Sequence, residues 1–326
     1  MKKLVLITTG GTISSVYDPQ KGYAPALDAD RLLGGKPLPI PDAQVETVPF
    51  AAILSFAMTP EMVLRLVELA EEKAADPDVA GIVISQGTAM LEESPYLADL
   101  FWRSEKPLVF TGAMLNGSEP DWDGPRNIRN ALITAASEDA RGKGVLVCLG
   151  GEIHAAKEVL KIHKTSLNPL CSVNAGPLGM IVNDRAAIYR APLKRTVFAQ
   201  KRVETAVEIV KVAMGSSGVL VDAMIHAGMK AIVLEALPGG GGVSPQVFES
   251  VKRNKDKAIF VMCPRSPGGI TVSKAGGGIG PVDQRTIGVL LAGGLTSVKA
   301  RIFLMAALPQ VKDSNEMAKL LDQTSM

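Results

Sequence analysis

The sequence predicts an α/β protein in which a large N-terminal domain, built on a mainly parallel sheet flanked by helices, precedes a smaller C-terminal α/β domain. Three observations support this prediction. Short apolar runs bounded by glycine and proline alternate with helical patterns, which is typical of βαβ units. The chain has 326 residues, which is enough for two domains. It contains 32 glycines but only 8 Phe, 2 Trp and 4 Tyr, which favours tight strand-to-helix turns over a sandwich packed with aromatic side chains.

Local signals define the elements of the N-terminal domain. Thr59-Pro60-Glu61 is a helix start before a pattern that runs to about residue 74, and Asp123-Gly124-Pro125 is another before a pattern that runs through residue 136. Leu91-Glu92-Glu93-Ser94 is expected to open a third helix. The expected strands are the apolar runs at residues 4–8, 81–85, 107–111 and 145–149.

A second series of α/β elements begins near Val207. Before it, Pro192 and four basic residues stand in a segment without sustained periodicity, which indicates a linker. We therefore expect an N-terminal catalytic domain at residues 1–193, a linker at 194–206 and a C-terminal domain at 207–326. After its first strand near residue 207, the C-terminal domain is expected to have a helix at about 217–227, a strand at 231–237, a helix at about 244–253, a strand at 258–263 and a closing helix at 297–308.

The composition argues against several classes of function. The 35 Lys and Arg against 33 Asp and Glu leave a net charge of +2, too small for a protein that binds nucleic acid or a membrane surface through charge. Three distant cysteines and three dispersed histidines match no metal-ligand spacing, and the glycines at 239–242 lack both the dinucleotide and the P-loop patterns. We expect neither a metal nor a cofactor. We also expect a cytoplasmic protein, because free thiols suit a reducing compartment and the apolar run at 4–7 is too short for a signal peptide.

Hydroxyl residues and glycines cluster at the carboxyl ends of two predicted strands. The first ends in Thr8-Thr9-Gly10-Gly11-Thr12 and the second in Ser85-Gln86-Gly87-Thr88. Ligands of open α/β sheets bind at such strand ends, so neighbouring strands would bring Thr12 and Thr88 to one pocket. For either threonine alone, ordinary turn chemistry is the competing interpretation. A threonine nucleophile also needs a base, and residues 151–165 offer one lysine turned into the pocket, with most of their other charges on a solvated face.

Six short motifs follow one another along the chain. They are Thr9-Gly10-Gly11-Thr12-Ile13, Gln86-Gly87-Thr88, Thr111-Gly112-Ala113-Met114, Asp123-Gly124-Pro125-Arg126-Asn127, Gly151-Glu152-Ile153-His154-Ala155-Ala156 and Asn174-Ala175-Gly176-Pro177-Leu178-Gly179. In this order and spacing they resemble the bacterial-type L-asparaginases and their glutaminase relatives. With Gly294-Leu295-Thr296 and Lys299-Ala300-Arg301, the resemblance covers nearly the whole chain. It implies an asparaginase-like amidohydrolase with a large and a small α/β domain, usually a homotetramer whose active sites form at an intimate dimer interface.

The resemblance also implies a role for individual residues. Thr12 would be the nucleophile that attacks the amide carbonyl, and Tyr23, in a mobile loop, would close over the pocket and hydrogen-bond Thr12. Thr88 and Lys161 would form a second hydroxyl relay, and Ser55 would bind the carboxylate of the substrate. Backbone amides around Gly11, Thr88 and Ala113 would donate to an anionic intermediate. The implied substrate-binding residues are Gly11, Ser55, Gln86, Gly87, Ala89, Met90 and Ala113.

The sequence departs from the family pattern where specificity is set. Gly87-Thr88-Ala89-Met90 stands in place of a Gly-Thr-Asp-Thr pattern, whose aspartate binds the α-ammonium group of the substrate and pairs with the lysine. A second carboxylate, supplied by a neighbouring subunit, aligns with Pro281, and Asp283 lies two residues away. A buried ammonium without a counter-charge costs on the order of several kcal/mol, so free asparagine should bind poorly. Without that aspartate, a desolvated Lys161 should also lose its proton more easily.

Three interpretations remain at this point. The first is an amidohydrolase that uses a threonine nucleophile on a small amide, lactam, imide or ester lacking the usual α-ammonium group. The second is an L-asparaginase in which another acid replaces the missing aspartate, and the third is a catalytically silent homologue that binds a small molecule. The third interpretation, a catalytically silent protein, is disfavoured because the chain retains all four implied catalytic residues, Thr12, Tyr23, Thr88 and Lys161. The expected partners are a small-molecule substrate and further copies of the chain, as a dimer or a dimer of dimers, without nucleic acid or membrane.

Overall fold

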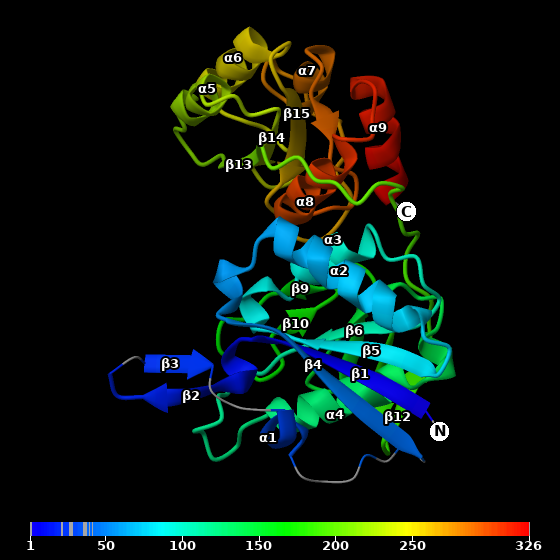
Figure 1. Ribbon diagram of the computed structural model, residues 1–326. Coiled ribbons are helices and arrows are strands. Elements are labelled where there is room, and N and C mark those ends of the chain that lie inside the picture. Colours follow the sequence, from blue (N-terminus) through cyan, green and yellow to red (C-terminus); the bar gives the residue numbers. More distant parts are fainter. Residues whose placement is uncertain are drawn as a thin grey trace. The chain divides into compact units, whose positions relative to one another are not determined.

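The structure, a computed structural model, describes residues 2–20, 22–25, 29–34, 38, 40 and 42–325. It divides into two compact units, Met1–Val197 and Phe198–Met326, whose helices and strands are labelled in Figure 1. The division lies inside the segment 194–206 that the sequence indicates as a linker. Within the described ranges, no helix combines the length and the apolar character that crossing a bilayer requires.

The main sheet of unit 1 is mostly parallel, as predicted. Its described strands lie in the order β12-β11-β8-β7-β6-β5-β1-β4, in which β4, β1, β5, β6 and β7 run parallel while β8, β11 and β12 are antiparallel to their neighbours. The four apolar runs expected as strands lie in β1, β5, β6 and β7. The strands of this sheet are β1 (Lys2–Gly10), β4 (Ala43–Ile53), β5 (Val79–Ser85), β6 (Leu108–Thr111), β7 (Val145–Leu149), β8 (Glu152–Ala155), β11 (Gly179–Val182) and β12 (Arg185–Ile188).

Two strand pairs of unit 1 lie outside this sheet. They are the antiparallel pair β2 (Ser15–Asp18) with β3 (Gly22–Pro25) and the antiparallel pair β9 (Leu160–Lys161) with β10 (Leu170–Cys171). The edge strand β4 lacks a strand pattern in the sequence, because Pro49 interrupts it and its side chains do not alternate between buried and exposed. Edge strands tolerate such a proline because only one of their sides is hydrogen-bonded.

Helices cover both faces of the sheet in unit 1. Figure 1 shows α2 and α3 on one face and α4 on the other. The predicted start of α2 is confirmed, since the Thr59 hydroxyl accepts a hydrogen bond from the backbone N–H of Met62 at 3.2 Å and Pro60 opens the helix. The helices are η1 (Thr12–Ser14), α1 (Ala29–Leu33), η2 (Ser55–Ala57), α2 (Pro60–Ala75), η3 (Thr88–Met90), α3 (Ser94–Asp99), α4 (Gly124–Ala135) and η4 (Glu138–Ala140), where η denotes a 3-10 helix.

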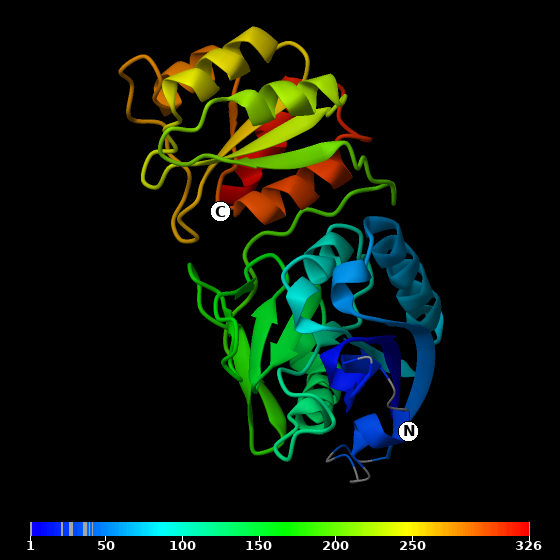
Figure 2. The same ribbon diagram turned by 90° about the vertical axis from the view of Figure 1, so that its left-hand side faces the viewer.

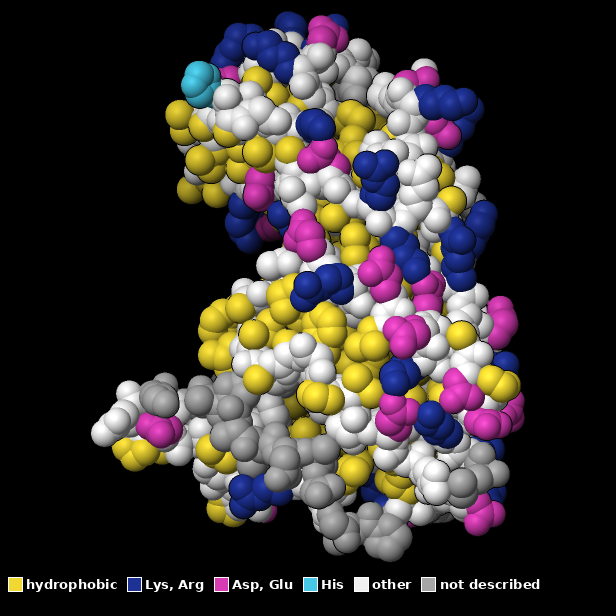
Figure 3. All heavy atoms as spheres, in the orientation of Figure 1, with side chains coloured by type: hydrophobic (Ala, Val, Ile, Leu, Met, Phe, Trp, Pro, Cys, Tyr) yellow, Lys and Arg dark blue, Asp and Glu magenta, His cyan; other side chains and the backbone are white. Residues whose placement is uncertain are grey.

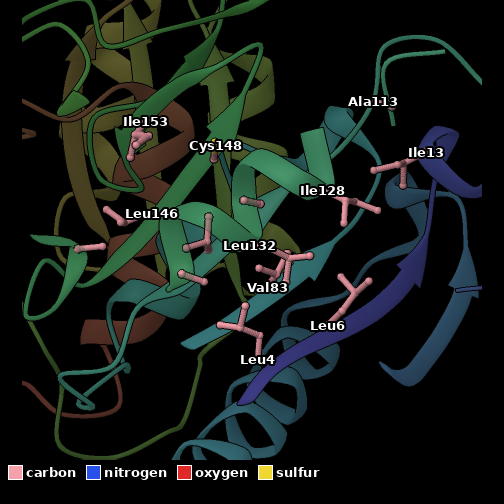
Figure 4. Packing of buried hydrophobic residues seen from close by; sticks show 14 of the residues in the cluster. Leu4, Leu6, Ile13, Val83, Ala113, Ile128, Leu132, Leu146, Cys148 and Ile153 are labelled. Carbon is pink, nitrogen blue, oxygen red and sulfur yellow. The ribbon is translucent and has the colours of Figure 1, made fainter. Parts of the chain in front are cut away.

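A hydrophobic core joins the α4 face to the strands. Leu6, Val83 and Leu146 from three strands pack with Ile128 and Leu132 of α4, all fully buried (Figure 4). The same cluster reaches the carboxyl edge of the sheet, where it includes Ile13 of η1 and Ala113, which follows β6. The loops after β1 and β6 are therefore anchored in the core directly beside the residues that the sequence selects as functional.

Unit 2 is a parallel α/β layer structure, as predicted. Its described strands lie in the order β13-β14-β15-β16, all parallel, and Figure 2 shows α5 and α6 on one face of the sheet and α8 on the other. The expected closing helix at 297–308 is α8, but the chain adds α9 after it. The elements are β13 (Val207–Lys211), α5 (Val219–His226), β14 (Ala231–Ala236), α6 (Pro245–Asn254), β15 (Ile259–Pro264), α7 (Pro281–Thr286), β16 (Leu290–Leu291), α8 (Ser297–Ala307), α9 (Ser314–Asp322) and η5 (Gln323–Ser325).

Candidate active site

The carboxyl ends of β6, β5, β1 and β4 form one edge of the unit 1 sheet. Ser85, at the end of β5, is paired with Thr8 of β1 on one side and Thr111 of β6 on the other. The loops that carry the two predicted threonines therefore leave adjacent strands at the same edge of the sheet. This is the arrangement that a shared pocket requires. Gly10 pairs with Ile53 of β4, which brings the loop that contains Ser55 to the same edge.

Three of these loops touch through atoms that leave no room for a larger residue. A Cβ atom added to Gly11 would lie 2.2 Å from the backbone nitrogen of Gly87, and φ of Gly11 is +84°. A Cβ on Gly87 would lie 2.5 Å from the Ser55 hydroxyl oxygen. Glycine is required at Gly11 both by its backbone conformation and by this contact. The predicted residues Gly11, Ser55 and Gly87 are thus brought together by backbone packing.

Thr12 begins η1 immediately after this crossing point and is half-buried. The turn is held by the hydroxyls of Ser14 and Ser15, which donate to the carbonyl of Gly11 at 3.2 and 2.8 Å. Tyr23 lies in β3, and its side chain is outside the part of the chain that the structure describes. The structure therefore places the Thr12 backbone at the strand edge, next to the loop that carries Thr88.

Thr88 and Lys161 are in direct contact. The Lys161 Nζ atom lies 2.7 Å from the Thr88 Oγ1 atom, and the Thr88 hydroxyl also lies 3.5 Å from the Met114 sulfur. Burial lowers the pKa of Lys161 below its ordinary value, and the negative charge of Glu92 opposes this effect. A lysine with a lowered pKa at hydrogen-bond distance from a hydroxyl is suited to accept a proton from it.

Lys161 has no side-chain ion pair within the described chain. The carboxylate of Glu92 instead accepts a hydrogen bond from the Lys161 backbone N–H, at 2.8 Å. Ala89 is exposed and supplies no charge, and Met90 beside it is half-buried. In unit 2, the Asp283 carboxylate accepts a hydrogen bond from the Gly280 N–H at 2.9 Å, where it helps to start α7. The carboxylate of Asp283 is thus occupied by a hydrogen bond at the start of α7.

Among the predicted backbone donors, two N–H groups lack an acceptor among the described residues, and one N–H group is already hydrogen-bonded. Of the backbone amides around Gly11, the N–H of Gly11 itself is already bonded to the carbonyl of Ile53 at 2.8 Å. The N–H groups of Thr88 and Ala113 have no acceptor among the described residues. Such unpaired N–H groups at a strand edge are suited to stabilise an oxyanion.

Asp123 has a different role from the one its sequence context indicates. It precedes α4, but its side chain makes no cap hydrogen bond to the helix. Its two carboxylate oxygens accept hydrogen bonds from the backbone N–H groups of Met114 and Leu115 at 3.1 and 2.9 Å. Asp123 thus fixes the loop after Ala113, and Asn127 reinforces it by donating to the Gly112 carbonyl at 3.0 Å.

The charges of residues 151–165 do not all form a solvated face, which corrects that expectation. His154 is fully buried, with Nδ1 2.9 Å from the Ser172 hydroxyl, and burial lowers its pKa. Glu152 Oε2 lies 3.2 Å from His154 Nε2 without the alignment of a hydrogen bond. Glu158 is paired with Arg190. These contacts hold the segment that leads to Lys161, and two of them, His154 with Ser172 and Glu158 with Arg190, join residues 18 and 32 positions apart in sequence.

Gln86 is a buried polar member of the predicted substrate-binding set. It is fully buried, and neither polar atom of its amide has a hydrogen-bond partner among the described residues. An unpaired buried amide costs about 1 to 3 kcal/mol, so this side chain carries a polar group available to a water or ligand. Within the described chain, no group of three or more His, Cys, Asp or Glu side chains is arranged to hold a metal.

Comparisons with known proteins agree with the resemblance that the motifs show. Residues 3–194 match the family described as "Asparaginase, N-terminal", and residues 206–321 match "Glutaminase/Asparaginase C-terminal domain". An L-asparaginase of Bacillus licheniformis is 32% identical over 96% of this chain and 97% of its own length. A glutaminase-asparaginase of Pseudomonas fluorescens is 32% identical over 98% of this chain and 90% of its own length. The crystal structure of a probable cytoplasmic L-asparaginase from Campylobacter jejuni superposes with a TM-score of 0.85 at 27% identity, covering 98% of this chain and 99% of its own.

The environment of Lys161 predicts that its amine titrates below the ordinary lysine value of 10.5. Because burial disfavours the charged form, Lys161 should become reactive toward trace acetic anhydride at a lower pH than an N-acetyl-lysine amide standard in the same tube. Mass spectrometry of the Lys161 peptide across a pH series measures this. Reactivity that follows the standard would show that the lysine stays protonated in the working range.

Proposed function

Because the chain belongs to the asparaginase family and is an amidohydrolase that acts on carbon–nitrogen bonds, we propose that it uses a threonine nucleophile on a small amide, lactam, imide or ester without an α-ammonium group. The observation that carries this proposal is the 2.7 Å contact between Lys161 Nζ and Thr88 Oγ1 in a site that has Ala89 instead of a carboxylate. The catalytic contact is retained while the group expected to bind an ammonium is absent.

The proposed reaction begins with attack of the Thr12 hydroxyl oxygen on the substrate carbonyl. The proton released by the nucleophile passes to the Thr88–Lys161 relay, and the N–H groups of Thr88 and Ala113 donate to the oxyanion. The relay then returns the proton to the leaving amine as the carbon–nitrogen bond breaks, which gives an acyl-threonine. A water molecule attacks this ester with the relay as base, and the product acid and free Thr12 result.

The surroundings of Ala89 favour a neutral or apolar group where an ammonium would lie. Phe56 of η2 is 72% exposed and follows Ser55, whose hydroxyl reaches Gly87. The short helix η2, which carries Phe56, lies beside η3, which carries Ala89 and Met90. Figure 3 shows hydrophobic side chains gathered where β4 leads into α2. Such a surface binds an apolar substituent and gives an ammonium no compensating charge.

The alternative is an ordinary L-asparaginase. Relatives with 32% identity carry the names L-asparaginase and glutaminase-asparaginase and match nearly the whole chain, which favours this alternative. It requires another acid in place of the missing aspartate. Within the described residues the carboxylate next to Lys161 is that of Glu92, which is bonded to backbone, and Asp283 is bonded to the start of α7.

We also propose that the chain acts in the cytoplasm as a homo-oligomer, a dimer or a dimer of dimers, with the active site at the interface. Tyr17, Ile162, Leu167 and Val173 are large exposed apolar residues of unit 1, a pattern that marks contact surfaces. Burial raises the pKa of the Cys148 thiol to about 12, so it stays protonated and unreactive, as suits a reducing compartment. Light scattering of the native protein should give a multiple of 34.3 kDa, and a monomer mass at micromolar concentration would contradict the assembly.

The substrate class is tested by ammonia release from a panel of amides and cyclic imides without an α-amino group, beside asparagine and glutamine. We expect turnover of at least one panel compound and about 100-fold lower kcat/KM for asparagine, because its ammonium would be unpaired. Thr12→Ala and Thr88→Ala should each reduce turnover by about 1000-fold or more. Efficient asparagine turnover by the native protein would refute the altered specificity, and turnover that survives both substitutions would refute the threonine mechanism.

The role of position 89 is tested by Ala89→Asp. A carboxylate there should raise asparagine turnover about tenfold or more by pairing with the α-ammonium group, and it should lower turnover of the neutral panel substrate. The matched control is Ala89→Asn, which has the same shape without the charge and should not improve asparagine. Equal behaviour of the Asp and Asn variants would show that a charge at this position does not set specificity.

A further inference from the structure

We propose that Glu92 is a positioning residue of this site: its carboxylate accepts the backbone N–H of Lys161 and thereby holds the lysine where its amine meets Thr88. The inference rests on the proposed role of Lys161 as the base of the relay. Glu92 belongs to neither of the implied sets of catalytic and substrate-binding residues. Its role follows from its contacts.

Lys161 lies on a short strand outside the main sheet. β9 contains two residues and pairs with the two residues of β10. The N–H groups of Ile162 and His163 extend this pair by bonding to the Pro169 carbonyl at 2.9 and 3.3 Å. The glycines and strands that fix the position of Thr12 and Thr88 therefore do not fix Lys161. A long, flexible side chain on such a segment needs another anchor to keep its amine within 2.7 Å of a hydroxyl.

Glu92 supplies that anchor from the segment that carries Thr88. It follows η3 by two residues, and the turn between them is closed by the N–H of Leu91 bonding to the Thr88 carbonyl at 3.4 Å. From this segment the Thr88 hydroxyl contacts the Lys161 amine at 2.7 Å, and the Glu92 carboxylate accepts the Lys161 backbone N–H at 2.8 Å. Two contacts at the two ends of one lysine fix both its backbone and its side chain relative to Thr88.

The same carboxylate is the charge that acts on the Lys161 amine. Burial lowers the pKa of Lys161, and Glu92 raises it again in part. Within the described chain, the two short elements beside Lys161 carry no other carboxylate: η3 consists of Thr88, Ala89 and Met90, and β10 of Leu170 and Cys171. The neighbouring titratable side chains along the chain are Glu93, His163 and Lys164. Where the family resemblance implies an aspartate as side-chain partner of the lysine, the Glu92 carboxylate is instead bonded to the backbone of the lysine.

Two substitutions separate the positional effect from the charge effect. Glu92→Gln keeps an oxygen that accepts the Lys161 N–H but removes the charge, whereas Glu92→Ala removes both. The matched control is Glu72→Gln on the exposed side of α2, which makes the same change in net charge away from the site. Lys161→Met tests the underlying role of the lysine. Thermal unfolding of each variant shows whether it is folded.

Three measurements on the intact protein distinguish the variants: acetic anhydride labelling of Lys161 across pH, hydrogen exchange of the peptide that contains Lys161, and the pH profile of turnover for a panel substrate. In Glu92→Gln we expect the labelling midpoint to fall by about one pH unit with exchange unchanged, because a nearby negative charge stabilises the protonated amine. In Glu92→Ala we expect the same fall in the labelling midpoint. Hydrogen exchange of the Lys161 peptide should be about tenfold faster or more, and kcat should be about tenfold lower at similar KM. Glu72→Gln should match the native protein in all three.

Each outcome has a defined meaning. Native-like labelling and exchange in both Glu92 variants, with Lys161→Met inactive, would overturn the role of Glu92 while leaving the proposed function intact. Turnover retained in Lys161→Met would instead overturn the proposed role of the lysine, irrespective of Glu92. Faster exchange in Glu92→Ala with an unchanged kcat would reduce Glu92 to a structural contact and overturn its role in positioning the lysine.

Discussion

The contact of the loops at Gly11, Ser55 and Gly87 is the constraint on which the rest of the site depends. A Cβ atom on Gly11 would lie 2.2 Å from the Gly87 nitrogen, so the loops after β1 and β5 meet backbone against backbone. The order of strands in the sheet places these loops side by side. The buried cluster that includes Ile13 and Ala113 anchors this edge of the sheet. Because both threonines follow a glycine of this contact directly, their separation is set by covalent geometry and packing.

The fold and the placement of the two threonines at strand ends could be predicted from the sequence because both depend on local patterns. Buried parallel strands are continuous apolar runs, and glycine followed by threonine marks two strand ends. The edge strand β4 and the short strands after β7 have no such pattern, so they were not predicted. Asp123, Glu92 and the His154–Ser172 pair were missed for a different reason. Their contacts are set by the tertiary fold, and no spacing rule reports that Glu92 reaches a backbone N–H 69 residues away.

The pKa of Lys161 depends on the absence of a carboxylate in direct contact with its amine. A lysine held against a hydroxyl by burial and one backbone-bonded carboxylate is closer to neutrality than a lysine in a direct ion pair. In the proposed function the absence of an aspartate at position 89 affects both chemistry and recognition, since a lysine with a lowered pKa is more often unprotonated and available as a base, and a bound ammonium would lack a counter-charge. Base strength and substrate preference are in this way coupled through one position.

In the single turn η3, a residue constrained by packing stands directly beside a residue that packing leaves free to vary. Within three consecutive residues it buries Thr88 and leaves Ala89 exposed. An exposed side chain can be exchanged without repacking the core, whereas the buried neighbour is held by its contacts with Lys161 and Met114. A substitution at position 89 can therefore change what lies beside the site while the packing that holds the Thr88 hydroxyl stays in place.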